Sequence, residues 1–220
     1  MSCWTIIPIR GLACGKSRLS GILSTDQRMA LNCEMLTRTL DAVSSAQIGL
    51  SKCLVVSDDA HALEFITNLG ALGLRESTPS GLNPALEQAR EFVIALGATE
   101  IMVLAADLPM ISSVAIAKVL STTTDDQSPI LFPDKNLSGT NGLWIRDVFR
   151  VPFLFGLDSL HRHKAAFLRM GATARYSFDD ALSFDLDSPE DYQNYLTISA
   201  LSNNQVATSL TQSLQSIPAT

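Results

Sequence analysis

Short apolar segments alternate along the chain with longer segments whose apolar side chains recur every three or four residues. The short segments have the length and composition of buried strands, which are expected at residues 4–9, 52–57 and 101–106. The longer segments predict helices with one apolar face, at residues 26–43, 59–69 and 83–96. Strands that alternate with helices of this length predict a mostly parallel sheet covered by helices on both faces.

Shorter elements continue this pattern in the rest of the chain. Ser112 is placed to cap a helix that runs to about residue 120, and Ser188 opens the last helix. Asn83 precedes a proline at the start of an apolar-periodic segment, so Asn83 is expected as a helix N-cap. Further strands are expected at residues 130–132, 143–145 and 173–177, and a further helix at residues 158–170.

The C-terminal end differs in composition from the rest. Residues 192–220 contain no charged side chain, and Ser, Thr, Asn and Gln dominate after residue 199. Such a segment has too few apolar side chains to offset the entropy of ordering it. We therefore predict one domain over residues 1–198 and a flexible tail over residues 199–220, to which no function is assigned.

Composition excludes several classes of protein. The 220 residues are 46% hydrophobic and 17% charged with a net charge of −6, so the chain lacks the basic face that nucleic-acid binding requires. No apolar run approaches the length of a transmembrane helix, and the N-terminus has no recognisable secretory signal. The four cysteines show no paired spacing. We expect a cytoplasmic protein with reduced thiols that binds neither nucleic acid nor membrane.

Cations gather directly after the first expected strand. Arg10, Lys16 and Arg18 are three of the chain's 16 Lys and Arg residues, and all lie within positions 10–18. Ligands bind at the carboxyl ends of strands in open parallel sheets, so a basic loop there indicates phosphate binding. An ordinary solvated loop is the other interpretation. The loop is not a P-loop, because Arg10 stands where that motif needs its first glycine.

Carboxylates follow two other apolar segments. Asp107 ends the strand at residues 101–106, and Asp185 and Asp187 end the apolar run at residues 181–184. Carboxylates from separate strand ends suit Mg²⁺, which takes one or two protein carboxylates and completes its octahedron with phosphates and water. Two structural interpretations stay open, namely that Asp107 is a turn residue and that Asp187 serves only the positive end of the last helix.

Other polar residues carry weaker signals. Thr140 and Asn141 lie in a glycine-flanked segment that is expected as a loop between strands. Ser159 begins a helix, where its hydroxyl and the free amides can hold a carboxylate or a phosphate. His161 and His163 are two residues apart on that helix and face different directions, so they are not expected to share a metal. They are expected at the surface, or as one histidine that touches substrate.

Seven short motifs, taken in chain order, resemble the 2-phospho-L-lactate guanylyltransferase family. They are Pro8-Ile9-Arg10, Lys16-Ser17-Arg18-Leu19, Gly81-Leu82-Asn83, Ala106-Asp107-Leu108-Pro109, Gly139-Thr140-Asn141, Phe155-Gly156 with Ser159 and His163, and Asp185-Leu186-Asp187-Ser188-Pro189-Glu190-Asp191. The match spans residues 4 to about 196. It implies a three-layer α/β, Rossmann-like nucleotidyltransferase fold of the GT-A-like type with a mixed, mostly parallel sheet.

The resemblance also implies an activity, which is transfer of GMP from GTP to a small phosphorylated acid with release of pyrophosphate. Family members perform this step in the biosynthesis of the deazaflavin coenzyme F420, with 2-phospholactate, phosphoenolpyruvate or phosphoglycerate as acceptor. GTP and such an acid are therefore the expected partners, and Mg²⁺ is the expected cofactor. Whether the protein forms a homodimer stays open.

Carried over residue by residue, the resemblance assigns each motif a role. It implies nucleotide contacts at Arg10, Lys16, Arg18, Asn83 and Asp107, acceptor contacts at Thr140, Gly156 and Ser159, and Mg²⁺ ligands at Asp107 and Asp187, with Asp185 as a further candidate. Lys16, Arg18 and Asp107 are the expected catalytic residues. A phosphate dianion is a nucleophile at neutral pH, so catalysis is expected to rest on positioning and charge, without a Ser, Cys or His base.

Two other functions fit the same residues. One is a nucleotidyltransferase that acts on molybdopterin or sugar phosphates. Those enzymes usually carry a glycine pair after the first strand, where this chain has Cys14-Gly15. The other is a non-catalytic module that binds GTP without turning it over. Release of pyrophosphate from GTP in the presence of Mg²⁺ and a phosphorylated acid distinguishes the catalytic functions from this one.

Overall fold

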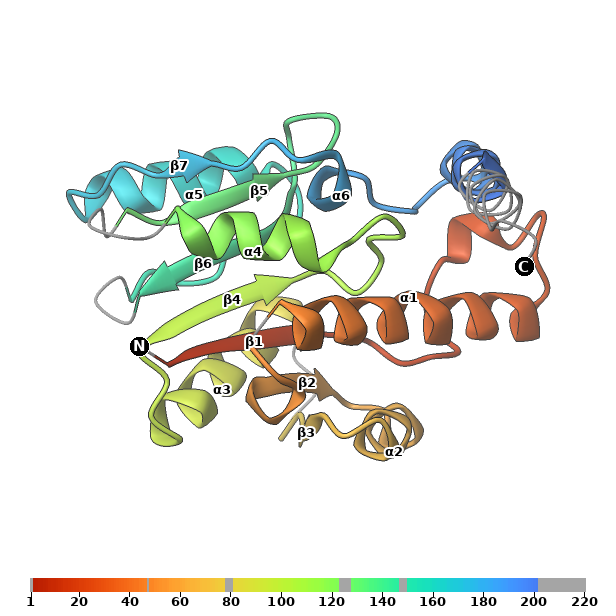
Figure 1. Cartoon of the computed structure of the whole chain (residues 1–220), viewed down its shortest axis with the longest axis horizontal. Coiled ribbons are helices and arrows are strands. Elements are labelled where there is room, and N and C mark those ends of the chain that lie inside the picture. The colour runs from red at the N-terminus through yellow and green to blue at the C-terminus, as the bar shows by residue number, and fades with distance from the viewer. Residues whose placement is uncertain (1, 47, 78–80, 123–127, 147–149, 202–220) are drawn as a thin grey trace, which may run out of the picture.

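A computed structural model describes residues 2–46, 48–77, 81–122, 128–146 and 150–201. Its centre is a seven-stranded sheet with the strand order β3-β2-β1-β4-β6-β5-β7 (Figure 1). The strands are β1 (Cys3–Pro8), β2 (Cys53–Ser57), β3 (Leu72–Arg75), β4 (Glu100–Leu104), β5 (Ile130–Pro133), β6 (Thr140–Arg146) and β7 (Arg175–Tyr176). Strands β1 to β4 are parallel, whereas β6 runs antiparallel to both β4 and β5. The expected mixed, mostly parallel sheet is confirmed.

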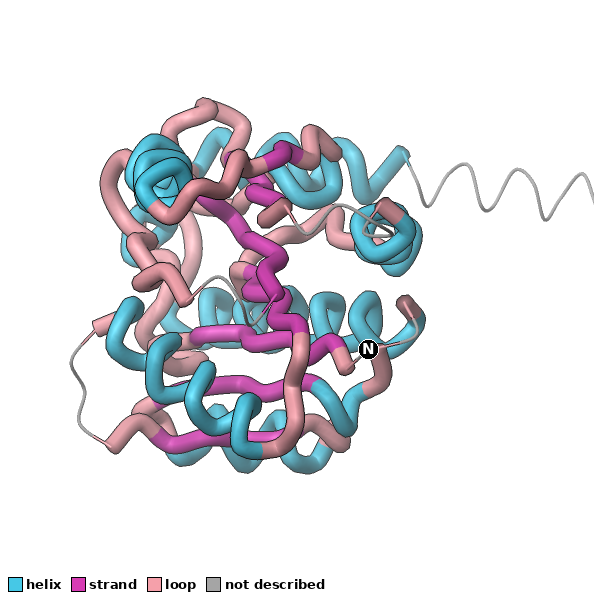
Figure 2. The backbone as a smooth tube through the Cα atoms, turned by 90° about the vertical axis from the view of Figure 1, so that its left-hand side faces the viewer, coloured by secondary structure: helices cyan, strands magenta, loops and turns pink. Residues whose placement is uncertain are grey.

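Helices cover both faces of this sheet and complete three layers. They are α1 (Thr25–Ser45), α2 (Ala60–Asn68), α3 (Leu82–Ala95), α4 (Ser113–Ser121), α5 (Ser159–Arg169) and α6 (Asp180–Ser183), with short 3₁₀ turns η1 (Ser17–Leu19) and η2 (Leu50–Lys52) and a further helix over residues 189–201. One apolar cluster joins α1, α2 and α4 to the sheet, and a second joins α3 and α5 to its other face. Figure 2 shows the twist of the sheet, whose strands at one end are steeply inclined to those at the other.

The alternation of side chains along the strands explains why two cores form. Ile7 and Val55 belong to the cluster under α1, whereas their neighbours Ile6 and Leu54 belong to the cluster under α3, and all four are completely buried. Successive side chains of a strand point to opposite faces, so a strand buried on both sides must be apolar throughout. This is the near-continuous apolar pattern from which the strands were predicted.

A third, smaller cluster attaches the C-terminal helix to the N-terminal part of the chain. Leu19 of η1 and Met35 of α1 pack there with Leu186 and Tyr195, and Tyr195 Oη donates a hydrogen bond to Glu34 Oε1 at 2.6 Å. Figure 1 shows this helix in blue beside the red-orange segment that leads into α1, at the opposite end of the molecule from the N-terminus. The helix continues through residue 201, so the predicted domain boundary at residue 198 lies inside it, and residues 202–220 lie outside the described part.

Three local expectations differ from the structure, and one strand was not expected. Helix α3 begins at Leu82 with Gly81 as its N-cap, so Asn83 lies in its first turn. Thr140 and Asn141 are the first residues of β6 and not part of a loop, because β6 pairs with β5 from Thr140 onward. Residues 181–183 belong to the one-turn helix α6, which Phe184 follows, and do not form a strand. Asp179 caps this helix, because its Oδ1 accepts a hydrogen bond from the Ala181 N–H. Strand β3 was not predicted, since its four residues are largely exposed and contain a glycine.

Within the described residues, no helix has both the length and the apolar character needed to span a bilayer.

Gly142 of β6 is expected to tolerate no larger residue. A Cβ atom there would lie 2.5 Å from the Val103 carbonyl oxygen and 2.6 Å from the Phe132 ring, both in neighbouring strands. Backbone cannot yield as a flexible side chain can, so Gly142→Ala should destabilise the protein by about 1–3 kcal/mol, the usual cost of overpacking. Urea unfolding of the variant measures this loss. Gly21→Ala is the control, because no atom lies within 4 Å of the place where its Cβ would stand and its φ is not left-handed.

Candidate active site

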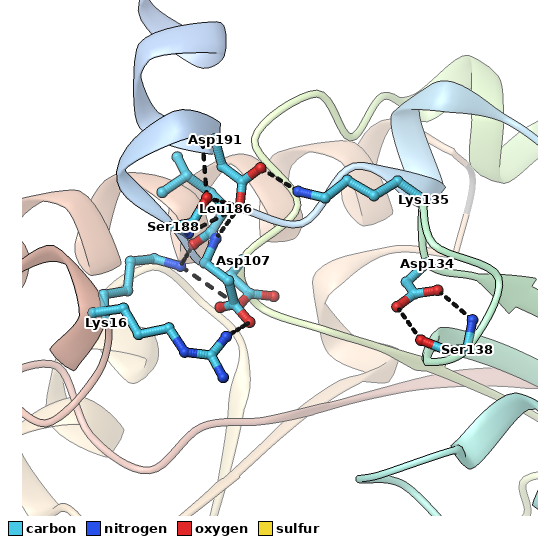
Figure 3. Close-up of polar contacts among 10 residues, drawn as sticks. Lys16, Asp107, Asp134, Lys135, Ser138, Leu186, Ser188 and Asp191 are labelled. Atoms are coloured by element: carbon cyan, nitrogen blue, oxygen red, sulfur yellow. Dashed lines mark hydrogen bonds and ion pairs between the residues drawn. The ribbon is translucent and has the colours of Figure 1, made fainter.

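Segments that are distant in sequence meet beyond the carboxyl ends of β1 and β4. Asp107 follows β4, and its backbone carbonyl accepts a hydrogen bond from the Leu186 N–H at 3.1 Å. Lys16 follows β1, and its Nζ donates to the Leu186 carbonyl at 2.6 Å and lies 3.5 Å from Asp107 Oδ2 (Figure 3). The structure thus brings together the basic loop, the carboxylate after β4 and the acidic segment 185–187.

The ammonium of Lys16 points inward. Its side chain is only 4% exposed, and its backbone is left-handed, with φ 56°. Such a conformation at a non-glycine residue costs about 1–3 kcal/mol and persists only where its surroundings hold it. Asp107 and the Leu186 carbonyl supply the partners that a buried ammonium needs. Lys16 therefore ties the basic loop to the acidic segment.

The neighbouring carboxylates are held close enough to oppose one another's ionisation. Burial raises the pKa of Asp107, Lys16 opposes this rise, and Asp187 adds to it. Burial also raises the pKa of Asp185, and both Asp107 and Asp187 act in the same direction. In addition, Asp185 Oδ1 is buried and has no hydrogen-bond partner within the described part of the chain.

These features test whether the site suits a divalent cation. Across the described ranges, no group of three or more His, Cys, Asp or Glu side chains is arranged to hold a metal ion. Mg²⁺ needs only one or two protein carboxylates when phosphates and water complete its coordination, however. An ion beside Asp107 and Asp185 would relieve their repulsion and give the orphaned Asp185 Oδ1 a partner. The residues present therefore fit Mg²⁺ in company with a phosphorylated ligand.

Asp187 occupies a different position from the other two carboxylates. Its Oδ2 lies 3.7 Å from Arg18 Nη1, and both side chains are largely exposed. Asp185 rather than Asp187 lines a cavity together with Asp107. Asp185 is therefore the better placed to share a cation held in this cavity, while Asp187, which acts on the pKa of Asp107, stays a candidate ligand as the sequence motifs predicted.

The turn that carries these carboxylates is organised by Asp191, which the sequence analysis gave no role of its own. Asp191 Oδ2 accepts hydrogen bonds from the Ser188 N–H at 2.9 Å and the Asp187 N–H at 3.1 Å, and Oδ1 accepts from the Lys135 ammonium (Figure 3). Ser188 Oγ accepts from the Asp191 N–H, which completes a capping box. Burial alone would raise the pKa of Asp191, but hydrogen bonds from Lys135 and Ser188 lower it. Asp191 thus stays charged and fixes the turn.

A cavity of 280 Å³ opens beside Asp107. Its lining includes the three predicted acceptor-contact residues together with two of the carboxylates: Thr140, Gly156, Ser159, Asp107 and Asp185. Gly156 has φ 113° and open space where a side chain would stand, so the backbone itself forms this part of the wall. A cavity of this size, with hydroxyls and bare backbone set among apolar side chains, suits a small acid.

A second cavity, of 540 Å³, lies on the other side of Pro8 and Leu82, which line both cavities. Arg10, Cys14 and Glu76 contribute to its lining. Cavities of this size hold ligands as large as nucleotides. Arg10 lines this cavity, and its contact with a nucleotide stays a prediction.

The amide of Asn83 is engaged within the protein. Its Oδ1 accepts from the Phe155 N–H at 2.8 Å, and its Nδ2 donates to the Phe155 carbonyl at 3.1 Å. Asn83 lines neither of the two cavities described above. It instead holds the segment before Gly156 against the first turn of α3, and its nucleotide contact stays a prediction.

His163 lies directly behind the smaller cavity. It is 1% exposed, and its Nδ1 is 3.1 Å from Thr140 Oγ1 while its Nε2 accepts a hydrogen bond from the Leu154 N–H at 3.0 Å. His161 is exposed, as is His61, and His161 pairs with Asp158. The surface position expected of His161 is correct, whereas His163 is a core residue. Periodicity could have shown this, because His163 shares the apolar face of α5 with Leu160 and Phe167.

The burial of His163 predicts a pH dependence of stability. Burial, with a contribution from Arg162, lowers the pKa of His163 from its ordinary value of 6.5 to about 4, against a hydrogen bond with the backbone of Ser159. Between these values the unfolded chain binds a proton that the folded chain does not, so stability falls as the pH falls from 6.5 to 4. His163→Asn cannot titrate, and its stability deficit relative to the native protein should shrink by about 3 kcal/mol over this window. Urea unfolding at pH 7 and pH 4 measures the difference, and an unchanged deficit would contradict the prediction.

The arrangement of strands and helices is similar to that of several solved structures. The fold is similar to that of a putative nucleotide-diphospho-sugar transferase from Desulfovibrio desulfuricans, with a TM-score of 0.68 and 14% identity over 85% of this chain and 83% of that one. It is also similar to a CMP:2-keto-3-deoxy-manno-octonic acid synthetase complexed with CTP, with a TM-score of 0.61 and 14% identity over 92% and 100% of the two chains. The fold is therefore that of the nucleotidyltransferases.

Sequence comparison identifies the family. A family model described as guanylyl transferase CofC like matches residues 3–205, and the chain belongs to this family. Phosphoenolpyruvate guanylyltransferase from Rubrobacter xylanophilus is 39% identical over 191 residues, which are 87% of this chain and 92% of the relative. The enzyme of the same name from Chloroflexus aggregans is 34% identical over 86% of this chain and 94% of the relative. The resemblance on which the sequence analysis relied is confirmed.

Proposed function

We propose that the protein transfers GMP from GTP to phosphoenolpyruvate and releases pyrophosphate. The observation that carries the proposal is the arrangement of two cavities with a common wall at Pro8 and Leu82, the smaller of which contains Asp107 and the predicted acceptor contacts. A nucleotide in the larger cavity and a phosphorylated acid in the smaller one would meet beside Asp107 and Lys16. The curated relatives that match most of the chain are phosphoenolpyruvate guanylyltransferases by name, which supports this acceptor.

The reaction is an in-line displacement at the α-phosphorus of GTP. An oxygen of the acceptor phosphate forms the new bond to phosphorus, and the bond to the β-phosphate oxygen breaks. The acceptor phosphate enters as a dianion, so no proton has to be removed from it before attack. What remains for the protein is to align the two phosphates and to stabilise the charge that gathers on pyrophosphate.

Residues of this chain supply that alignment and charge. Arg10 and Arg18 are exposed on the loop after β1, where they can reach a triphosphate, and Lys16 adds a buried ammonium at the same loop. Asp107 and Asp185 would hold Mg²⁺, which when bound neutralises phosphate charge. Asp191 keeps the turn that carries Asp185 in place through the backbone N–H groups of the residues that follow.

Incubation of the purified protein with GTP and a panel of phosphorylated acids tests the proposal. We expect Mg²⁺-dependent pyrophosphate release with phosphoenolpyruvate and a GDP-linked product of matching mass. Release with 2-phospholactate or phosphoglycerate alone would move the assignment to another acceptor. No release with any acid, despite GTP binding, would support the non-catalytic GTP-binding module.

A role in making coenzyme F420, a cytoplasmic location and homodimer formation belong to the same proposal, and gel filtration tests the last of these.

Ser159→Ala should raise the KM for the acceptor about tenfold and leave the KM for GTP within about twofold of the native value. Ser159 is 1% exposed and lines the smaller cavity, where its Oγ accepts the Thr140 N–H at 2.8 Å and keeps its own proton for a ligand. Steady-state kinetics with each substrate varied in turn measures both constants. Ser121→Ala, at the exposed end of α4, is the control. Equal effects on both KM values would place Ser159 away from the acceptor.

A further inference from the structure

The hydrogen bonds of His163 determine which of its nitrogens carries the proton. Nε2 accepts from the Leu154 N–H at 3.0 Å, so this nitrogen is unprotonated. A histidine buried to 1% exposure with a pKa near 4 is neutral at physiological pH, so the one ring proton must be on Nδ1. The ring cannot turn over easily, because Phe155 packs against it in a T-shaped contact at 4.9 Å.

This tautomer determines the direction of the next hydrogen bond. Nδ1 lies 3.1 Å from Thr140 Oγ1. Because Nδ1 carries the proton, it is the donor, shared between the backbone of Ser159 and this hydroxyl, and the hydroxyl is an acceptor. The Thr140 hydroxyl proton is then left over. Thr140 Oγ1 has no other hydrogen-bond partner among the described residues, and Thr140 lines the smaller cavity. Its proton is therefore available to a ligand there.

The hydroxyl of Ser159, like that of Thr140, accepts a hydrogen bond from within the protein. Its Oγ accepts the Thr140 N–H at 2.8 Å, so its hydroxyl proton is also left for the cavity. Two adjacent hydroxyls thus present protons to the same space. A ligand group that lies against both must be able to accept two hydrogen bonds, as an ionised carboxylate or a phosphate can.

We propose that His163 is a positioning residue that fixes the Thr140 hydroxyl as a donor and thereby makes the cavity selective for an anionic acceptor group. The proposal rests on the proposed function, because it takes the smaller cavity to be the acceptor site. His163 itself touches no substrate; it acts through Thr140 and is shielded by Leu154 and Phe155.

Two substitutions each preserve only one of the two hydrogen bonds that the imidazole makes with Thr140 and Leu154. The amide of His163→Asn reaches about as far as Nδ1, so it can still donate to Thr140 but not accept from Leu154. The amide of His163→Gln reaches about as far as Nε2, so it can accept from Leu154 but no longer donates to Thr140. We expect the Kd for phosphoenolpyruvate, measured calorimetrically with a non-hydrolysable GTP analogue present, to rise about tenfold in His163→Gln and by less than about threefold in His163→Asn.

A double-mutant cycle with Thr140→Val removes the hydroxyl that His163 is proposed to orient. In the Thr140→Val background, His163→Gln should change the Kd for phosphoenolpyruvate by less than about twofold, because no hydroxyl remains to be oriented. His161→Gln, two residues away at the surface, is the matched control and should leave the Kd unchanged. Thermal unfolding of each variant reports its stability separately.

The outcomes distinguish this proposal from the one on which it rests. If the two His163 variants weaken phosphoenolpyruvate binding equally, in proportion to their loss of melting temperature, or if the His163→Gln effect persists in Thr140→Val, His163 is structural and the proposal is wrong. If the native protein neither binds nor guanylates any phosphorylated acid, the proposed function fails instead. Selective weakening in His163→Gln that disappears in Thr140→Val supports the proposal.

Discussion

Replacing Asp107 by asparagine is expected to lower the rate of guanylyl transfer by about a thousandfold or more while the protein still folds. The carboxylate lies at the wall of the smaller cavity, beside Lys16 and Asp185, where the proposed reaction needs a negative charge to hold a cation next to the phosphates. Asparagine has nearly the same shape and leaves the backbone bond from the Leu186 N–H to the residue 107 carbonyl intact. The loss should therefore appear in kcat and not in stability.

Pyrophosphate release and thermal unfolding, measured on the same preparation, check this expectation. Asp41→Asn, at an exposed position of α1, removes one carboxylate elsewhere and should leave both quantities unchanged. An Asp107→Asn protein with substantial turnover would rule out Asp107 as a residue that binds the cation. If Asp107→Asn fails to fold, the negative charge of Asp107 is needed to balance Lys16. Asp185→Asn would then test the cation site.

Replacing Lys16 by methionine is expected to lower kcat by about 10²–10³-fold, which corresponds to about 2.7–4 kcal/mol of transition-state stabilisation. The buried ammonium lies 3.5 Å from Asp107 Oδ2, beside which the proposed function places the reacting phosphates. It also joins the loop after β1 to the segment 185–187 through the Leu186 carbonyl. Methionine keeps the length of the side chain and removes both its charge and its hydrogen bonds. A fall in melting temperature should therefore accompany the fall in kcat.

Single-turnover kinetics separates the chemical step from substrate binding in this variant. Lys164→Met, on the exposed side of α5, is the control for the loss of one lysine. A Lys16→Met protein that loses stability but retains the single-turnover rate would show that Lys16 is a structural tie without a catalytic role.

The fold was predictable because its elements are strongly patterned. The strands β1, β2 and β4 are apolar on both faces, and α1 begins with a capping box formed by Ser24 and Gln27. Elements that depend on tertiary contacts were not predictable. The short strand β3 is exposed and owes its conformation to pairing with β2, and the turn α6 is held by Asn141, whose amide donates to the Leu182 and Ser183 carbonyls.

The sequence predicted which residues meet at the site, but it did not predict most of the contacts that these residues make. The carboxyl ends of parallel strands lie at one edge of a sheet, so the convergence of Lys16 and Asp107 followed from the strand assignment. The inward direction of Lys16 depends on the Leu186 carbonyl, which no local pattern indicates. The same holds for Asn83, whose contacts are with Phe155, 72 residues away in the chain.

The partition between the two cavities has a consequence for how substrate preference can change. Pro8 and Leu82 each present one side to the larger cavity and another to the smaller one. Under the proposed function, a substitution at Leu82 that widens one cavity also alters the other, so selectivity for donor and for acceptor cannot change independently at this residue. A lineage that takes up a bulkier acid has to make room through Thr140 or Phe155, which border the smaller chamber alone, if its choice of nucleotide is to remain the same.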